Sequence, residues 1–147
     1  MSDTINPTNL IANPSMTFAK PANEVDVTAG QRLTVDGSGK GITYVVSGDN
    51  TDSGNANAVL TITDPKHFKG TIDIGSFAAV VFQGIAADSY TYSDNTLTLY
   101  SGNRVLDKLT VESNGGFAIG GRFNNFVELV TGVIHSGFGG IILPVHT

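Results

Sequence analysis

Short segments in which apolar and polar residues alternate constrain the fold of this chain more than any other feature. Val25 and Val27 alternate with polar neighbours, and the same pattern recurs in residues 33–35, 42–46, 59–62 and 71–74. A period of two is typical of strands with one buried face. Turn formers separate these segments, as in residues 36–39 and 47–50, where Gly and Asn allow a positive φ. The pattern predicts an all-β chain of about ten short strands.

The clearest local prediction is an antiparallel meander over residues 90–112. Residues 90–92, 96–100 and 104–112 are strand-like, and two tight connections join them. Gly102-Asn103 suits a type II′ or bulged turn. Residues 126–134 carry a tolerable helical stripe, but their Val and Thr residues favour a strand, and Gly132 weakens a helix by about 1 kcal/mol.

Repeated turns and alternating strands predict a β-sandwich, antiparallel and jelly-roll-like. The Leu-Thr-(Val/Ile/Leu) theme recurs at Leu33, Leu60, Leu97 and Leu109, at offsets of 27, 37 and 12 residues. These unequal offsets do not make the fixed-period repeat of a solenoid. The offsets therefore disfavour a β-solenoid, which is the alternative fold.

The chain has the size of one domain, and its N-terminal part differs in composition from the remainder. Residues 1–23 contain three prolines among Asn, Thr and Ser, whereas the strand pattern starts at Glu24. We expect residues 1–23 to form an extended arm and residues 24–147 a single β domain. The arm docks either on its own domain or on a neighbouring copy, and its plausible anchors are Leu10, Ile11, Met16 and Phe18.

Charge and cysteine content narrow the classes of partner. Charged residues make up 14% of the 147 residues, against about a quarter in ordinary soluble domains, and the net charge is −5. Few charges protect a surface poorly against self-association, and eight scattered Lys and Arg residues argue against nucleic acid as a partner. The absence of cysteine excludes disulfides and thiolate metal sites. Neither an N-terminal signal peptide nor an apolar run long enough for membrane insertion is visible.

Residues 61–113 resemble the β-strand repeat modules of secreted bacterial surface proteins, the RTX and autotransporter-like adhesins. The resemblance lies in Asp64-Pro65, Phe68, Gly70, Ile72, Gly84-Ile85, Tyr90-Thr91-Tyr92, Leu97-Thr98-Leu99 and Leu109-Thr110-Val111. It implies a structural module that is exported to the bacterial surface, and it is also the source of the solenoid alternative. The Gly-Asp that usually follows the apolar strand and the Gly-Gly-x-Gly-x-Asp calcium repeat are both absent.

No residue pattern predicts catalysis. None of the three histidines, His67, His135 and His146, belongs to a metal-ligand or nucleophile motif, and no acid–base pair can be named. We therefore expect a protein that is not an enzyme and that has no cofactor. Asp49 and Asp52 are a weak candidate for Ca²⁺, because calcium accepts carboxylate oxygens at flexible geometry. The alternative is that they form a turn.

Two further groups of residues are candidates for binding. Tyr90 and Tyr92 share one face of their strand and form either an aromatic platform for a sugar or a cross-strand aromatic pair. The apolar tail ends in a predicted edge strand over residues 141–145, in which Pro144 donates no ladder bond. This tail either completes the core or offers an edge to another chain. Its candidate assembly residues are Ile141, Ile142, Leu143 and Val145.

Together with the resemblance of residues 61–113, which implies a bacterial exported module, the composition and strand pattern predict an extracellular or cell-surface structural protein. In this hypothesis the chain is a self-assembling subunit of a surface or biofilm-matrix filament, its partners are copies of itself, and the N-terminal arm adds a strand to the next subunit. The alternative is a monomeric adhesin module that binds a polysaccharide.

Overall fold

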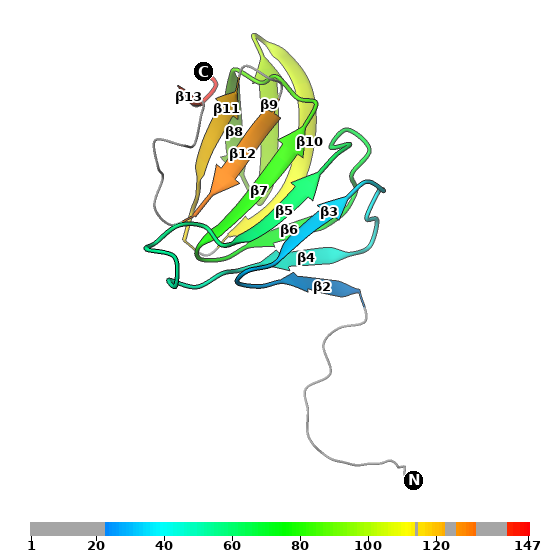
Figure 1. Cartoon of the computed structure of the whole chain (residues 1–147). Coiled ribbons are helices and arrows are strands. Elements are labelled where there is room, and N and C mark those ends of the chain that lie inside the picture. The colour runs from blue at the N-terminus through cyan, green and yellow to red at the C-terminus, as the bar shows by residue number, and fades with distance from the viewer. Residues whose placement is uncertain (1–22, 114, 123–125, 132–140) are drawn as a thin grey trace.

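The computed structural model describes residues 23–113, 115–122, 126–131 and 141–147, and these residues form two β-sheets packed face to face (Figure 1). The first sheet has the order β2-β4-β6-β10-β9-β8. Its strands are β2 (Glu24–Val27), β4 (Thr43–Val46), β6 (Thr71–Ile74), β10 (Arg104–Ser113), β9 (Thr96–Ser101) and β8 (Ser89–Ser93). The second has the order β13-β11-β12-β7-β5-β3. It consists of β13 (Ile141–Ile142), β11 (Ala118–Arg122), β12 (Phe126–Val130), β7 (Ala78–Gln83), β5 (Ala58–Ile62) and β3 (Arg32–Val35). The all-β, sandwich-like fold predicted from the alternation is confirmed.

The strands of the N-terminal half pair in parallel, where the sequence predicted antiparallel pairing. The chain alternates between the sheets, so that β2, β4 and β6 lie side by side in one sheet and β3, β5 and β7 in the other. Each strand returns to its sheet only after the chain has crossed to the opposite one, and it therefore runs in the same direction as its predecessor. This winding is that of the alternative prediction, a solenoid, confined to half of the molecule. Both sheets are consequently mixed.

The C-terminal half contains the predicted meander. β8, β9 and β10 pair antiparallel in sequence order. Gly102, with a φ of 60°, occupies the first central position of the two-residue turn between β9 and β10, as a type II′ turn requires. Asp94 and Asn95 both have positive φ, which is the signature of a type I′ turn. The segment with the helical stripe is a strand, β12, paired with β7 and β11.

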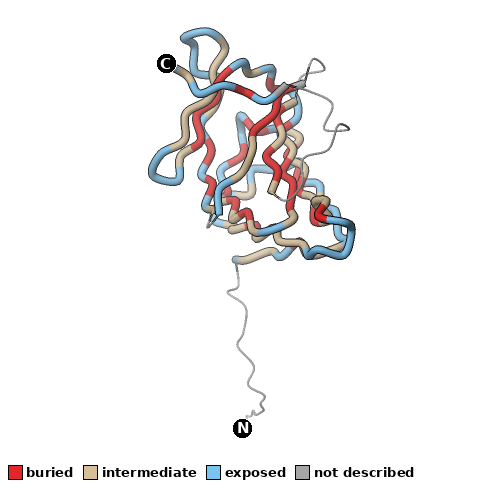
Figure 2. The backbone as a smooth tube through the Cα atoms, turned by 90° about the vertical axis from the view of Figure 1, so that its left-hand side faces the viewer, coloured by how far each residue is buried: buried red, intermediate tan, exposed pale blue. Residues whose placement is uncertain are grey.

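The core is a cluster of buried residues contributed by the strands of both sheets, and buried residues are red in Figure 2. In the first sheet Val27, Val46 and Ile74 are in register and fully buried. Leu60 in β5 and Val80 in β7 make the equivalent pair in the second. Burying each such side chain stabilises the fold by about 1.5–3 kcal/mol. Within the described residues no helix has the length and apolarity of a membrane span.

Candidate functional site

The C-terminal tail joins the two sheets at one end of the sandwich. β13 pairs with β11, and the amide of Leu143 donates to the carbonyl of Ile119, so this part of the tail belongs to the second sheet. The chain then reaches the first sheet, where Val145 forms a parallel bridge with Tyr90. Leu143 is buried, with its Cδ2 2.9 Å from where a Cβ on Gly121 would stand. The tail is thus the edge strand of the second sheet, and it pairs with strands of its own copy.

The four candidate assembly residues of the tail lie in different environments. Leu143 is part of the core cluster, whereas Ile142 and Val145 are 56% and 59% exposed. Ile141 is in β13, opposite Gly121. Ring stacking fixes the end of the tail, because His146 lies 3.9 Å from Tyr100 between ring centroids. Among the candidates whose side chains are described, Ile142 and Val145 offer apolar surface to a partner.

The outer edge of β8 is covered by the tail along part of its length. The amide of Tyr90 donates to the carbonyl of Pro144, and the carbonyl of Tyr90 accepts from the amide of His146. Backbone groups two residues apart in a strand face the same side, so those of Tyr92 face the same outer edge. No hydrogen bond to them is found within the described part of the chain. A second strand could pair there.

An apolar groove of about 470 Å³ lies beside this uncovered part of β8. Its walls are the two candidate tyrosines, Tyr90 and Tyr92, together with Phe117 and Val145. Tyr92 meets Phe117 edge to face at 5.0 Å, and its hydroxyl donates to the carbonyl of Val111 at 2.6 Å. Burial and, second, the negative charge of Glu112 raise the pKa of Tyr92. The ring of Tyr92 therefore forms part of the groove wall, while its backbone amide and carbonyl have no partner among the described residues.

Sequence reasoning did not identify Phe117 or the role of Val145 in this groove. Phe117 follows Gly115-Gly116 and precedes β11. An aromatic residue directly after two glycines was the available signal, but only the tertiary structure places its ring against Tyr92.

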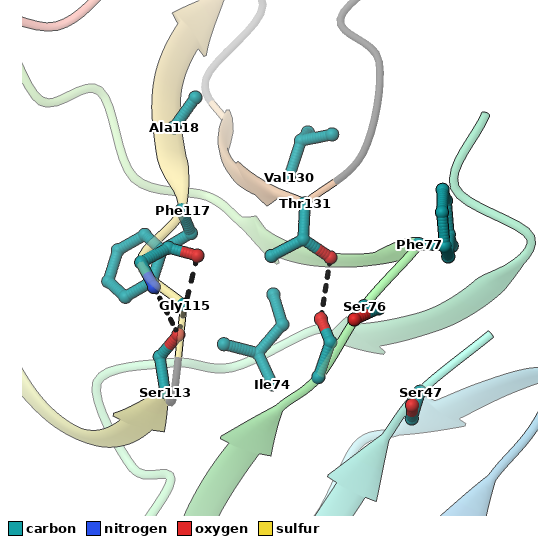
Figure 3. Close-up of a pocket in the computed structure, with 12 residues that line it drawn as sticks. Ser47, Ile74, Ser76, Phe77, Ser113, Gly115, Phe117, Ala118, Val130 and Thr131 are labelled. Atoms are coloured by element: carbon teal, nitrogen blue, oxygen red, sulfur yellow. Dashed lines mark hydrogen bonds between the residues drawn. The ribbon is translucent and has the colours of Figure 1, made fainter. Parts of the chain in front are cut away.

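A larger hollow of about 660 Å³ opens at the mouth of the sandwich, flanked by Phe77 and Phe117 (Figure 3). On one wall, the Thr131 hydroxyl donates to the carbonyl of Gly75 at 2.6 Å and accepts from the amide of Ala78. Ser113 and Gly116 bond to each other on the opposite wall. These hydrogen bonds hold together the segments that line the hollow. Phe117 lines this hollow as well as the groove.

The edge of β3 lies at the other end of the sandwich. Val59 and Thr63 in and after β5 donate to the carbonyls of Gln31 and Val35. Alternate residues of β3 thus face β5, and the amides and carbonyls of Arg32 and Thr34 face outward. Both residues are exposed, and no partner for these groups is present among the described residues. β3 is therefore an open strand edge.

The calcium candidates, Asp49 and Asp52, lie in a loop whose own residues donate hydrogen bonds to the carboxylate of Asp49. Asp49 Oδ1 accepts from the amide and hydroxyl of Thr51 and from Asn57 Nδ2. These bonds from Thr51 and Asn57 lower the pKa of Asp49. Asp52 accepts a backbone bond from Asn55 in the same turn. No cluster of three or more potential metal ligands is found in the described ranges.

The remaining candidates are dispersed. His67 bonds to Asp64 at 2.8 Å in an exposed turn, far along the chain from the stacked His146. Leu10, Ile11, Met16, Phe18 and His135 lie outside the described residues, as does nearly all of the predicted arm. Compared with known families, curated proteins and solved structures, the chain matches none. The resemblance of residues 61–113 to adhesin repeat modules therefore stays a prediction.

Proposed function

We propose that this chain is a structural subunit that assembles with copies of itself, as an extracellular component of a bacterial surface or biofilm-matrix filament. The observation that carries the proposal is the presence, at opposite ends of the sandwich, of strand edges that have no partner among the residues the structure describes. The outward backbone groups of Arg32 and Thr34 lie at one end, and those of Tyr92 lie at the other.

Two different surfaces at opposite ends favour head-to-tail contacts. Such contacts are heterologous, and when the rotation between copies does not close, they propagate into a filament. Unpaired strand edges are the usual templates for pairing with another chain, and proteins that stay monomeric tend to protect them with Lys, Pro or bulges. The edge of β3 carries a single charged residue, Arg32, to protect it against such pairing. The low charged fraction of the whole chain, 14%, adds little electrostatic repulsion between copies.

The test is the mass of the full chain in solution as a function of concentration. We expect sedimentation and light scattering to show growth of the particle as concentration rises, and electron microscopy to show elongated assemblies. A particle that keeps the mass of one chain at every concentration up to millimolar would exclude the proposal.

The second candidate is a monomeric carbohydrate-binding module, and the groove beside β8 is the observation that favours it. A sugar ring could pack on Tyr90 and Phe117, which line an apolar hollow. Glycan-array binding by a monomer, abolished in Tyr90→Ala and retained in Tyr100→Phe, would support this function. Tyr100 is a suitable control because its ring is stacked on His146.

A further inference from the structure

The groove beside β8 has two features that together suit an extended peptide. One is the outward amide and carbonyl of Tyr92, which continue the edge that the tail occupies at Tyr90. The other is the apolar hollow lined by Tyr90, Tyr92, Phe117 and Val145. In strand addition, backbone bonds to an edge supply affinity, and pockets for alternate side chains supply specificity.

We propose that this groove receives residues Met16–Phe18 of a second copy as an added strand. The assignment rests on the proposed self-assembly and names the surface that mediates it. In an extended strand, Met16 and Phe18 would share one face because they are two apart, whereas the adjacent Leu10 and Ile11 would be on opposite faces. Methionine and phenylalanine side chains pack favourably on aromatic walls. Pro14 and Pro21 flank the segment and disfavour helix.

Chain length favours a second copy as the donor. β2 and β8 are the opposite edges of a six-stranded sheet, and five strand spacings separate them by about 24 Å along the sheet. Phe18 precedes β2 by six residues, which span at most about 22 Å when fully extended. The groove lies on the far side of β8, so Phe18 falls short of the groove of its own copy. The segment of another copy has no such limit.

The charges near the two partners are complementary. Lys20 is the only Lys or Arg before Arg32, and it lies two residues after Phe18. Glu112 stands close enough to Tyr92 for its charge to act on the phenol. Asp94 is exposed in the turn that follows β8. A strand placed in the groove would therefore bring its cation to an acidic rim.

Because the chain contains no cysteine, disulfide trapping between two full-length variants tests the contact directly. One variant carries Phe18→Cys. The other carries Ser93→Cys, at an exposed residue on the groove wall. We expect the oxidised mixture to give a covalent heterodimer on a non-reducing gel, at least tenfold more than a mixture with Lys108→Cys. Lys108 is an exposed residue of β10 away from the groove.

Three outcomes would overturn the assignment. The first is equal yield with Ser93→Cys and Lys108→Cys while wild-type chains still assemble, which would leave the proposed function standing. The second is an internal disulfide in dilute chains that carry both Phe18→Cys and Ser93→Cys, which would show that the arm docks on its own copy. A wild-type chain that never assembles is the third, and it would remove the proposed function as well.

Charge reversal provides a readout without cysteine. Lys20→Glu should weaken assembly several-fold, and Glu112→Lys on the same chain should restore most of it. Failure of the second change to restore any assembly would contradict the placement of Lys20 at the acidic rim.

Discussion

The structure assigns roles to single residues that differ from what their type suggests. Asp107 is a surface-type residue, yet one oxygen of its carboxylate, Oδ2, is buried and has no hydrogen-bond partner in the described part of the chain, while Oδ1 accepts from the amide of Lys108. Burial is the largest influence on this group and raises its pKa. The irregularity between β9 and β10 at Val105 and Asp107 explains this position, because a bulge turns a side chain out of its regular direction.

Asp107→Asn should stabilise the protein at neutral pH. A raised pKa in the folded state means that the stability is full below the unfolded pKa and decreases as pH rises through the folded pKa. The side-chain amide of asparagine does not ionise, so the variant does not lose stability in this way as pH rises. Urea unfolding of both proteins should give equal stability near pH 3 and a more stable variant at pH 7. A variant that is less stable at pH 7 would show that the carboxylate has a stabilising partner.

Tyr92→Phe should cost about 1 kcal/mol of stability at neutral pH, because the carbonyl of Val111 loses its donor. The raised pKa of Tyr92 adds a pH dependence: stability is full below the ordinary tyrosine pKa of about 10 and falls as pH rises above it. Phenylalanine cannot ionise, so the variant should lose less stability above pH 10. If the free energy of unfolding changed with pH in the same way for both proteins across this range, the assignment would be contradicted.

Gly48→Ala should be destabilising by about 1–3 kcal/mol, because a Cβ there would lie 1.9 Å from Asn57 Oδ1 and 2.4 Å from the carbonyl of Phe77. The matched control is Gly37→Ala, since nothing lies within 4 Å of a Cβ at Gly37. The control should differ from wild type by less than about 0.5 kcal/mol in urea unfolding. Equal effects of the two substitutions would show that the turn can yield.

At the scale of elements, the pairing of the tail with β8 should depend on one buried side chain, that of Leu143. Leu143→Ala should cost about 2–3 kcal/mol, since Leu143 is buried and its loss leaves a cavity. The variant should also lose hydrogen-exchange protection at the amides of Tyr90 and His146, which pair β8 with the tail. Ile142→Ala is the control, because Ile142 is mostly exposed. Unchanged protection in Leu143→Ala would show that the β8 pairing does not depend on this anchor.

At the scale of the whole molecule, the open edge of β3 should contribute to assembly. Thr34→Pro removes an amide that faces outward, so the pairing of β3 with β5 keeps its hydrogen bonds while an added strand loses one. We expect this variant to fold, by circular dichroism, and to assemble at higher concentration than wild type. Thr34→Ala keeps the amide and should assemble like wild type. Identical assembly of both variants would exclude the β3 edge from the contact.

The sequence determined the local structure of this protein. Period-two alternation fixed which segments are strands and which face of each is buried, and the Asp94-Asn95 and Gly102-Asn103 turns fixed the antiparallel meander, because these signals depend on neighbouring residues only. Tyr90 and Tyr92 could be placed on one strand face for the same reason.

Only the tertiary structure decided how the strands of the N-terminal half pair. A half-buried strand has the same alternation in a parallel and in an antiparallel sheet, so the pattern in β2 to β7 could not reveal the parallel winding. The groove beside β8 depends on contacts between residues far apart in sequence, since the ring of Phe117 contacts that of Tyr92 and Val145 forms a backbone bridge with Tyr90. Local patterns carry no information about such contacts, and this is why the position of the groove became visible only in three dimensions.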